Sequence, residues 1–306
     1  MLAAIDAGSN TLRLLIGKVI AGKVVPELYL RRICRLAGDF TDEEGLSAAA
    51  RERTLIAFKE LAEVCQDLAV EQVRAVGTAA FRQAVNGDDF AREIRAATQI
   101  SLEVISGESE AARMTEGVLS ALDPLPSQAL IIDIGGGSTE FVLCLDQKAV
   151  WSRSLPLGVV RLTEDYPTPQ LRHQVIEGAL TELVAELLKV CNTSKVDFTA
   201  LALVGTAGTV TTLAALDLQM ADYDWRRVNN YSLSLLRLQY WQSKLTPLSP
   251  VEREALPGME EGRGDLIVAG LEITLCLMQQ MNSECLVVSD FGILEGLLLS
   301  MGSGDL

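Results

Sequence analysis

The sequence is organised around LIIDIGGGSTEFV at residues 130–142. An apolar run ends at Asp133, three glycines and two hydroxyl residues follow, and a second apolar run begins. This pattern predicts a strand, a tight turn and a second strand. Glycines let the backbone approach a ligand closely, and successive backbone N–H groups can converge into an anion-binding concavity. Asp133 can hold a water or a cation beside such an anion. An ordinary hairpin with a glycine turn would fit this one stretch as well.

The same order of residues opens the chain. LAAIDAGSNTLRLLIG at residues 2–17 is again an apolar strand, an aspartate, a glycine, hydroxyl residues and a second strand. Asp133 follows Asp6 by 127 residues (133 − 6), and the VGTA at 204–207 repeats the VGTA at 76–79 with an offset of 128 (204 − 76). Two motifs that repeat at one spacing predict duplicated halves. We expect the two glycine loops to face each other across one cleft.

Length and charge limit the class of protein. The chain has 306 residues, enough for two domains with sizeable cores. Its net charge of −15 argues against non-specific nucleic-acid binding and against docking on an anionic membrane. An anionic substrate remains possible if its site has a local basic lining. Arg31, Arg32 and Arg35 cluster where a strand at 24–34 ends, and they fit either a solvated basic edge or such a lining.

Cysteine and histidine usage points to a reduced protein without a histidine metal site. The six cysteines have no CxxC spacing and most of them lie in apolar stretches, so we expect buried, reduced thiols. The single histidine, His173, lies in a charged helical stretch and is expected at the surface. No signal peptide and no membrane-spanning run is recognisable, which predicts a cytoplasmic protein.

Strand pairs alternate with amphipathic helices, which indicates an α/β fold with mixed sheets. The linker at residues 122–127 places a domain boundary near residue 124, giving domains at 1–124 and 125–306. The last helix, at about 291–300, is a candidate to pack back on the first domain. In the second domain, a strand pair is expected to end near 157–162, and Ser232 is expected to cap a helix.

Two common phosphate-binding motifs are missing. No GxxxxGK[ST] P-loop occurs. The glycines at 135–137 precede strand-like sequence rather than a helix, which excludes a dinucleotide fingerprint. The sequence therefore predicts that phosphates are bound by backbone amides and hydroxyls from hairpin turns, within a cleft between domains.

Seven motifs in this order resemble the exopolyphosphatase and guanosine pentaphosphate phosphohydrolase family, Ppx/GppA, within the actin-like ATPase superfamily. They cover nearly the whole chain. They are Asp6-x-Gly-Ser-Asn-Thr, Gly77-Thr-Ala-Ala-Phe-Arg82, Ile105-Ser-Gly-x-x-Glu-Ala111, Asp133-Ile-Gly-Gly-Gly-Ser-Thr-Glu140, Leu157-Gly-x-x-Arg-Leu162, Gly205-Thr-Ala-Gly-Thr209 and Ser289-Asp-x-Gly-x-x-Glu-Gly296.

The resemblance implies two ribonuclease-H-like domains and a phosphohydrolase that releases terminal orthophosphate from polyphosphate or from guanosine pentaphosphate. Water would attack the terminal phosphorus in line, with Glu110 as general base. Arg82 would contact substrate phosphate. The other implied residues form three sets: phosphate-binding Gly8, Ser9, Asn10, Thr11, Gly135, Gly136, Gly137 and Ser138; Mg²⁺-binding Asp6, Asp133 and Glu140; and a nucleotide or distal-phosphate loop of Gly205, Thr206 and Gly208. A homodimer is a further implication.

The chain departs from the family pattern at three points. Ser109 stands where the family often has the first of two adjacent glutamates, so one carboxylate remains for the base. Ala207 stands where serine is frequent. Longer members carry further C-terminal helical domains with a His-Asp signature, and this sequence resembles the short two-domain form.

Two other hypotheses remain open. A kinase of the same superfamily would move phosphate from ATP to a small acid or sugar, with Gly205–Thr209 contacting adenosine. A non-catalytic sensor would bind polyphosphate or the guanosine nucleotide without turnover. Release of phosphate without an acceptor separates the hydrolase from both.

Overall fold

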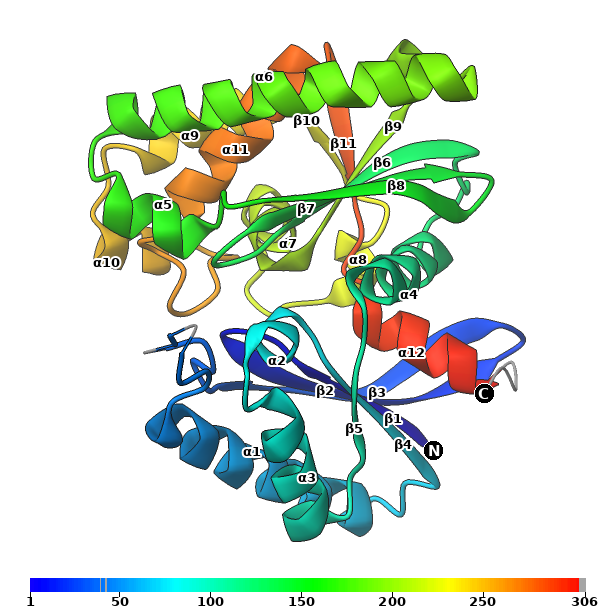
Figure 1. The fold of residues 1–306 in the computed structure, drawn as a ribbon. Helices are drawn as coiled ribbons and strands as arrows, with labels where there is room; N and C mark the ends of the chain where they lie inside the picture. Colours follow the sequence, from blue (N-terminus) through cyan, green and yellow to red (C-terminus); the bar gives the residue numbers. More distant parts are fainter. Residues whose placement is uncertain (39, 42, 303–306) are drawn as a thin grey trace. The chain divides into compact units, whose positions relative to one another are not determined.

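The computed structural model describes residues 1–38, 40, 41 and 43–302, and it divides into two compact units (Figure 1). Unit 1 comprises Met1–Ser120 together with the C-terminal segment that starts at Gly292, and unit 2 comprises Ala121–Phe291. The sequence placed the division at residue 124, within the linker that follows Ser120. Each unit is built around one mixed sheet.

Unit 1 has a five-stranded sheet in the order β3-β2-β1-β4-β5. The β1, β2 and β3 strands are antiparallel, whereas β4 runs parallel to β1 and β5 parallel to β4. The strands are β1 Leu2–Ala7, β2 Thr11–Ile20, β3 Lys23–Ile33, β4 Gln72–Gly77 and β5 Leu102–Val104. The helices are α1 Ala48–Asp67, α2 Ala79–Gln83, α3 Gly87–Thr98, α4 Gly107–Ser120 and α12 Ile293–Gly302.

Unit 2 has a six-stranded sheet in the order β10-β11-β9-β6-β7-β8. Its strands are β6 Gln128–Ile134, β7 Thr139–Leu145, β8 Lys148–Leu155, β9 Ala202–Thr206, β10 Ser232–Ser234 and β11 Cys285–Val288. Its α-helices are α5 Val159–Asp165, α6 Pro169–Ser194, α7 Ala207–Asp217, α8 Trp225–Val228, α9 Leu235–Leu245, α10 Pro250–Glu254 and α11 Ile267–Gln280, and a 3₁₀ turn covers Phe198–Ala200.

The two sheets repeat one topology, as the duplicated motifs predicted. The run β8-β7-β6-β9-β11 in unit 2 matches β3-β2-β1-β4-β5 in unit 1, and β10 is an additional edge strand. Equivalent backbone hydrogen bonds close the last parallel pair, from Ile105 N to Gly77 O at 3.1 Å and from Ser289 N to Gly205 O at 2.9 Å. This duplicated α/β arrangement confirms the predicted fold class.

Both faces of the unit 1 sheet are buried at its central strand β1. Successive side chains of a strand point to opposite faces, so Ile5 lies in the core formed with α1 and α3, while Ala4 faces the other side. Helix α12 contacts β1 and β2, and it packs against α4. Gly117 and Gly296 make that packing close, because added Cβ atoms would lie 1.7 Å from Gly292 O and 1.9 Å from Arg113 O. Two glycines therefore fix the helix that begins near Glu110.

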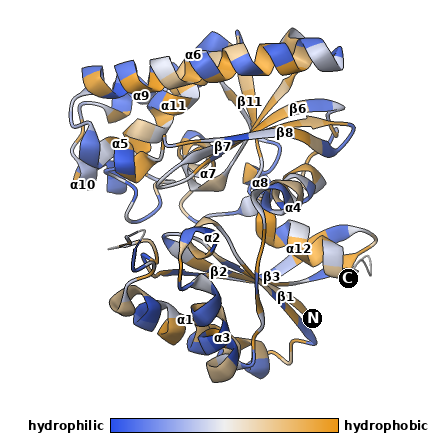
Figure 2. Cartoon of the chain, viewed as in Figure 1, coloured by the Kyte–Doolittle hydropathy of each residue, from blue (hydrophilic) through white to orange (hydrophobic). Residues whose placement is uncertain are grey.

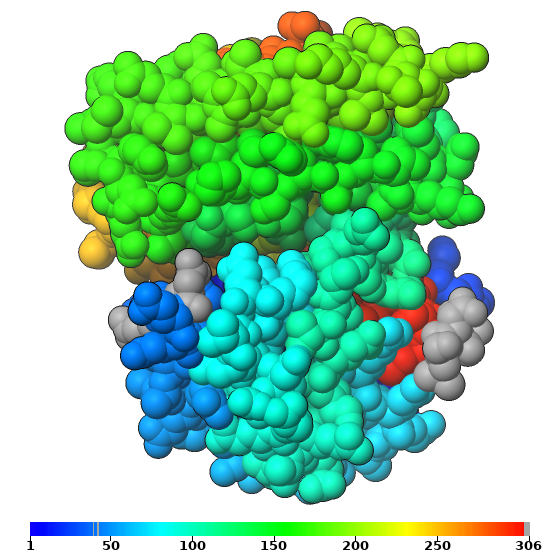
Figure 3. All heavy atoms as spheres, viewed as in Figure 1, coloured from blue at the N-terminus to red at the C-terminus, as the bar shows by residue number. Residues whose placement is uncertain are grey.

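The core of unit 2 lies between its sheet and the helices α6, α7, α9 and α11. The α11 helix is buried almost all round, whereas α6 alternates apolar and polar residues (Figure 2). In the face shown in Figure 3, α6 forms much of the outer surface of unit 2. In the part of the chain that the structure describes, no helix combines the length and apolar character that a bilayer crossing requires.

Two predicted element boundaries in unit 2 are wrong. The strand pair ends at Leu155, and α5 starts at Val159 after Gly158, so residues 158–162 are the cap and first turns of a helix. Ser232 opens the short strand β10, and Ser234 caps α9 by accepting a hydrogen bond from Arg237 N. In both cases short apolar runs fit a strand and a helix equally well.

Candidate active site

The carboxyl edge of the unit 1 sheet gathers three segments that the sequence singled out. Because β1, β4 and β5 are parallel, the first glycine loop (residues 8–11), α2 and α4 all begin at this edge. Thr78 N donates to Ala7 O at 3.3 Å, which joins the start of α2 to the end of β1. Ligands of open α/β sheets bind beyond the carboxyl ends of parallel strands. The first glycine loop, Arg82 and Glu110 therefore share an edge suited to a ligand.

The first glycine loop is a tight turn supported from one side. Gly8 N donates to Thr11 O at 3.0 Å, which closes the turn. Ser9 O accepts from Ala37 N at 2.8 Å, and Asn10 O accepts from Cys34 N at 3.0 Å and from Arg35 N at 2.8 Å. These bonds tie the loop carbonyls to residues 34–37 and leave the side chains of Ser9 and Asn10 exposed. The loop is thus preorganised to present polar groups to an anion.

Asp6, predicted as a Mg²⁺ ligand, is buried and paired with an arginine. Arg13 donates to Asp6 Oδ2 from Nε at 3.0 Å and from Nη2 at 2.5 Å. The pairing follows from hairpin register, since Asp6 lies directly opposite Arg13. The prediction omitted Arg13, although its place in the second strand of the hairpin was readable from the sequence. Asp6 is the least exposed of the predicted metal ligands, and the pairing with Arg13 compensates its charge.

Arg82 and Glu110 meet in unit 1. Arg82 lies in α2, and its Nη1 donates to Glu110 Oε2 at 2.6 Å and to Ile105 O at 3.0 Å. Glu110 lies in the first turn of α4. The side chains are 30% and 31% exposed, so water reaches both of them. The arrangement gives the carboxylate a fixed orientation and a cation beside it, which a helix-dipole role alone would not require.

The second glycine loop (residues 135–138) repeats the first and has additional support. Gly135 N donates to Ser138 O at 2.9 Å, as Gly8 N does to Thr11 O. Gly135 O accepts from Val159 N at 3.0 Å and Gly136 O from Val160 N at 2.9 Å, so the first turn of α5 holds the loop. A Cβ on Gly158 would lie 2.1 Å from Gly136 O. Only glycine at position 158 therefore allows the start of α5 to pack this closely on the second glycine loop.

The acidic residues beside the second loop differ in their surroundings. Glu140 Oε1 accepts from Ser138 Oγ at 2.6 Å and from Ser154 Oγ at 2.8 Å, which fixes its carboxylate to the hydroxyl of the loop. Asp133 is half-buried at the end of β6, opposite Glu140 on one side and Thr206 on the other. Ser154 was absent from the predicted site, and only its register opposite Glu140 in β8 identifies it.

The predicted metal-binding carboxylates fit a cation that takes most of its ligands from water and substrate rather than from the protein. Among the residues that the structure describes, no three acidic, histidine or cysteine side chains are grouped as a metal site. Mg²⁺ is commonly bound through one or two carboxylates, with waters and substrate phosphates completing an octahedron. Asp133 and Glu140 in unit 2 meet this smaller requirement, and Asp6 in unit 1 meets it less well because Arg13 competes for its oxygen.

The third predicted loop, at residues 205–209, joins β9 to α7. Thr206 Oγ1 donates to Phe291 O at 3.0 Å, and Ala207 adopts a positive φ of 63° that favours glycine. The Arg263 guanidinium lies against Gly208, where a Cβ would be 1.8 Å from its Nη2, and Arg263 also pairs with Glu260. No sequence pattern pointed to Arg263, because it lies 55 residues beyond Gly208 (263 − 208).

The structure therefore assembles part of the predicted site within each unit. Unit 1 brings together the first glycine loop, Arg82 and Glu110, and unit 2 brings together the second glycine loop, Asp133 and Glu140. The expectation that both loops grip one anionic chain across a cleft stays a prediction. His173 is exposed and lies 3.6 Å from Glu177, as expected of a surface residue.

The Ppx/GppA phosphatase family matches residues 16–303. A guanosine-5'-triphosphate,3'-diphosphate pyrophosphatase of Aeromonas salmonicida is 31% identical over 303 residues, which are 98% of this chain and 59% of that protein. The chain thus spans about three-fifths of the length of that relative. Exopolyphosphatase 2 of Mycobacterium tuberculosis is 35% identical over 326 aligned positions, covering 98% of both chains.

Solved structures of similar proteins have the same fold. A Ppx/GppA family member of Aquifex aeolicus superposes with a TM-score of 0.83 at 30% identity, covering 99% of this chain and 98% of that one. An exopolyphosphatase of Cytophaga hutchinsonii gives a TM-score of 0.84 at 26% identity with the same coverage.

Proposed function

Because the chain belongs to the Ppx/GppA phosphatase family, we propose that it is a phosphohydrolase that removes terminal orthophosphate from linear polyphosphate. The observation that carries the proposal is the Arg82–Glu110 pair at the sheet edge from which the first glycine loop extends. Polyphosphate comes first because the exopolyphosphatase relative matches over 98% of its length. Guanosine pentaphosphate is the second candidate substrate, favoured by the Aeromonas relative.

In this proposal the two glycine loops bind the substrate phosphates, and the Glu110 carboxylate activates the attacking water. Backbone N–H groups and hydroxyls of the two glycine loops donate to phosphate oxygens and stabilise charge that develops there. Glu110 orients a water against the terminal phosphorus and accepts its proton. The water oxygen forms a bond to phosphorus as the bond to the bridging oxygen breaks, and the shortened chain leaves with the electron pair of that bond. A positioned general base contributes about 10²–10⁴-fold in rate.

Arg82 has two roles in this scheme. Its bonds to Ile105 O and Glu110 Oε2 hold the carboxylate in one orientation. Its other guanidinium nitrogen would donate to substrate phosphate. Mg²⁺ held by Asp133 and Glu140 would neutralise charge on the bound phosphates. Glu140 also fixes the Ser138 hydroxyl, which links the acidic pair to the second glycine loop.

Phosphate release from linear polyphosphate, measured with Mg²⁺ and without any acceptor, tests the proposal. The hydrolase produces orthophosphate in proportion to enzyme and time. A kinase would release no orthophosphate, because it transfers the phosphoryl group of ATP to an acceptor rather than to water. A sensor would bind polyphosphate and leave its length unchanged. Guanosine pentaphosphate offered in a parallel reaction ranks the two substrates.

A further inference from the structure

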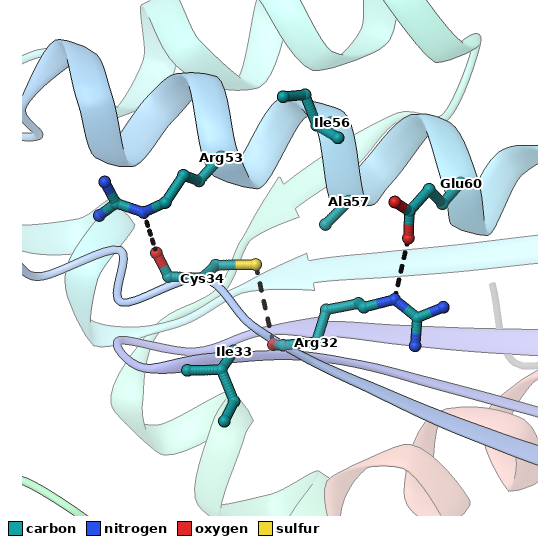
Figure 4. Close-up of a pocket in the computed structure, with 7 residues that line it drawn as sticks. All are labelled: Arg32, Ile33, Cys34, Arg53, Ile56, Ala57 and Glu60. Carbon is teal, nitrogen blue, oxygen red and sulfur yellow. Dashed lines mark hydrogen bonds and ion pairs between the residues drawn. The ribbon is translucent and has the colours of Figure 1, made fainter.

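Unit 1 contains a pocket beyond the residues assigned above. It lies between the end of β3 and helix α1 and is lined by Ile33, Arg35, Gly38 and Arg53, with a volume of about 540 Å³. A smaller pocket of about 240 Å³ adjoins it and shares Ile33 and Arg53 (Figure 4). The larger volume lies within the range of small-molecule sites, about 300–1,000 Å³. The charged residues that line the larger pocket are both arginines.

Arg53 is positioned by backbone rather than by a carboxylate. Its Nε donates to Cys34 O at 3.1 Å and its Nη2 to Arg35 O at 3.4 Å, and Figure 4 shows its terminal nitrogens pointing away from Ile56 and Glu60. Within the described part of the chain, neither Arg53 nor Arg35 forms an ion pair. Carbonyl acceptors orient a guanidinium without cancelling its charge, so this pair keeps its positive field.

The neighbouring Arg32 provides a contrast. Its Nε donates to Glu60 Oε2 at 2.9 Å, so its charge is compensated by a residue of α1 (Figure 4). The chain has a net charge of −15, and two arginines without an ion pair among the described residues give this pocket a positive charge of its own. Such a pocket has the basic lining that an anionic ligand needs.

The pocket is joined directly to the first glycine loop. Arg35 N and Cys34 N both donate to Asn10 O, and Ala37 N donates to Ser9 O. The turn that carries Arg35 is closed by Gly38 N donating to Arg35 O at 2.9 Å, and Arg35 holds a positive φ of 48°. The segment that supports the first glycine loop thus carries Arg35, and its carbonyls position Arg53 of α1.

We propose that Arg35 and Arg53 form a second anion subsite, which binds phosphoryl groups of the substrate remote from the phosphate that is removed. This rests on the proposed function. The planar guanidinium of Arg53 offers paired N–H donors that match phosphate oxygens, and Arg35 adds charge at the rim. We expect a substrate anchored at the Gly8–Thr11 turn to occupy this subsite with the phosphates that extend past the turn, so a long chain should depend on it more than a short one.

The experiment compares Arg35→Gln and Arg53→Gln with wild type on tripolyphosphate and on long-chain polyphosphate. KM for the long chain rises about tenfold, the equivalent of one lost charge-assisted contact, while kcat stays within twofold. KM for tripolyphosphate changes much less. Arg35→Lys restores most of the long-chain KM. Arg92→Gln, which removes an exposed arginine paired with Asp89, is the matched control and leaves KM unchanged.

Equal effects on short and long chains, or an equal effect of Arg92→Gln, overturn the subsite. Guanosine pentaphosphate is the third substrate tested. A rise in KM for this nucleotide with no change for polyphosphate would assign the arginines to the nucleotide's second phosphate group. That result would also contradict a subsite for long polyphosphate chains. If wild type releases no phosphate, the proposed function fails by itself. Calorimetric binding of long-chain polyphosphate then decides the subsite, which stands if Arg35→Gln weakens binding and falls if it does not.

Discussion

Arg82 Nη1 lies 2.6 Å from Glu110 Oε2, and the two residues reach each other from helices that follow neighbouring parallel strands. Their meeting depends on the sheet, because β4 delivers α2 and β5 delivers α4 to the same edge. It depends also on α12, which packs on α4 through Gly117 and Gly296. A chain segment from the far end of the sequence thereby steadies the helix of the proposed base.

Replacing Glu110 with Gln keeps the shape of the side chain and removes its ability to accept a proton. We expect phosphate release to fall at least about 100-fold, while polyphosphate binding stays within a few-fold of wild type. Steady-state kinetics and calorimetry measure the two quantities. Glu108→Gln in the same first turn of α4 is the control and retains near-wild-type turnover. Turnover by Glu110→Gln above a tenth of the wild-type rate would exclude Glu110 as the base.

Gly158→Ala tests the support of the second glycine loop. The new Cβ would lie 2.1 Å from Gly136 O, so the loop or α5 must move. Overpacking of this kind costs about 1–3 kcal/mol of unfolding free energy, and the displaced loop loses its phosphate geometry. The free energy of unfolding, measured with denaturant, and the rate of phosphate release should both fall.

The matched control for Gly158→Ala is Gly178→Ala, on the exposed face of α6. Apart from its chain neighbours and the backbone of its own helix, nothing lies within 4 Å of the position of its added Cβ. Alanine favours a helix by about 0.5–1 kcal/mol over glycine. This variant should be at least as stable as wild type and equally active. Full activity in Gly158→Ala would show that the α5 contact does not shape the second loop.

Metal dependence is the third prediction. Phosphate release should stop when EDTA is added and return with excess Mg²⁺. Asp133→Asn should raise the Mg²⁺ concentration for half-maximal rate by about tenfold, because a neutral ligand replaces a charged one. Glu182→Gln on the exposed face of α6 is the charge-matched control. A metal-independent wild type, or an unchanged Mg²⁺ requirement in Asp133→Asn, would remove these carboxylates from the site.

The Asp217 carboxylate stabilises unit 2 in a way that depends on pH. Burial by itself raises the pKa of this carboxyl, but hydrogen bonds from Arg237, Tyr231 and Trp241 outweigh burial and leave the pKa below its ordinary value. A lowered folded-state pKa means that the stabilisation is complete above the unfolded value of about 3.9 and is lost as pH falls through the lower folded value.

Asp217→Asn should therefore lower the free energy of unfolding by about 2 kcal/mol at pH 7. The difference from wild type should shrink below about pH 4, where the wild-type carboxylate protonates. Urea unfolding at several pH values measures this, and Asp222→Asn, an exposed neighbour, should show no such change. A difference that grows toward low pH would have the wrong sign for this mechanism.

The sequence was sufficient for the fold class, for the duplicated halves and for the residues at strand ends. Apolar strands that end in Asp6 and Asp133, repeated at one spacing, predicted two like sheets with glycine loops at their edges. The two sheets do not share one strand register, however, although their motifs repeat. Gly77 lies opposite Ala7 in unit 1, whereas Gly205 lies opposite Ile132, two residues before the equivalent of Ala7. A shift of two residues keeps every side chain on its face, so hydrophobic pattern cannot detect it.

The missing parts of the site are contacts between segments distant in sequence. Arg263 reaches Gly208 from a loop before α11, and α5 supports the second glycine loop through backbone bonds that carry no residue signature. Arg53 was simply a polar position on an amphipathic helix until tertiary structure brought it to Cys34 O. Side-chain chemistry was predictable where strand register brought groups together, and it was not where packing of helices and loops did so.

Hydrolysis of polyphosphate in ¹⁸O-labelled water, followed by mass analysis of both products, tests the central claim most directly. Attack by water on the terminal phosphorus predicts one ¹⁸O atom in the released orthophosphate from a single turnover and none in the shortened chain. Label at the new end of the chain, or unlabelled orthophosphate, would contradict attack by water at the terminal phosphorus.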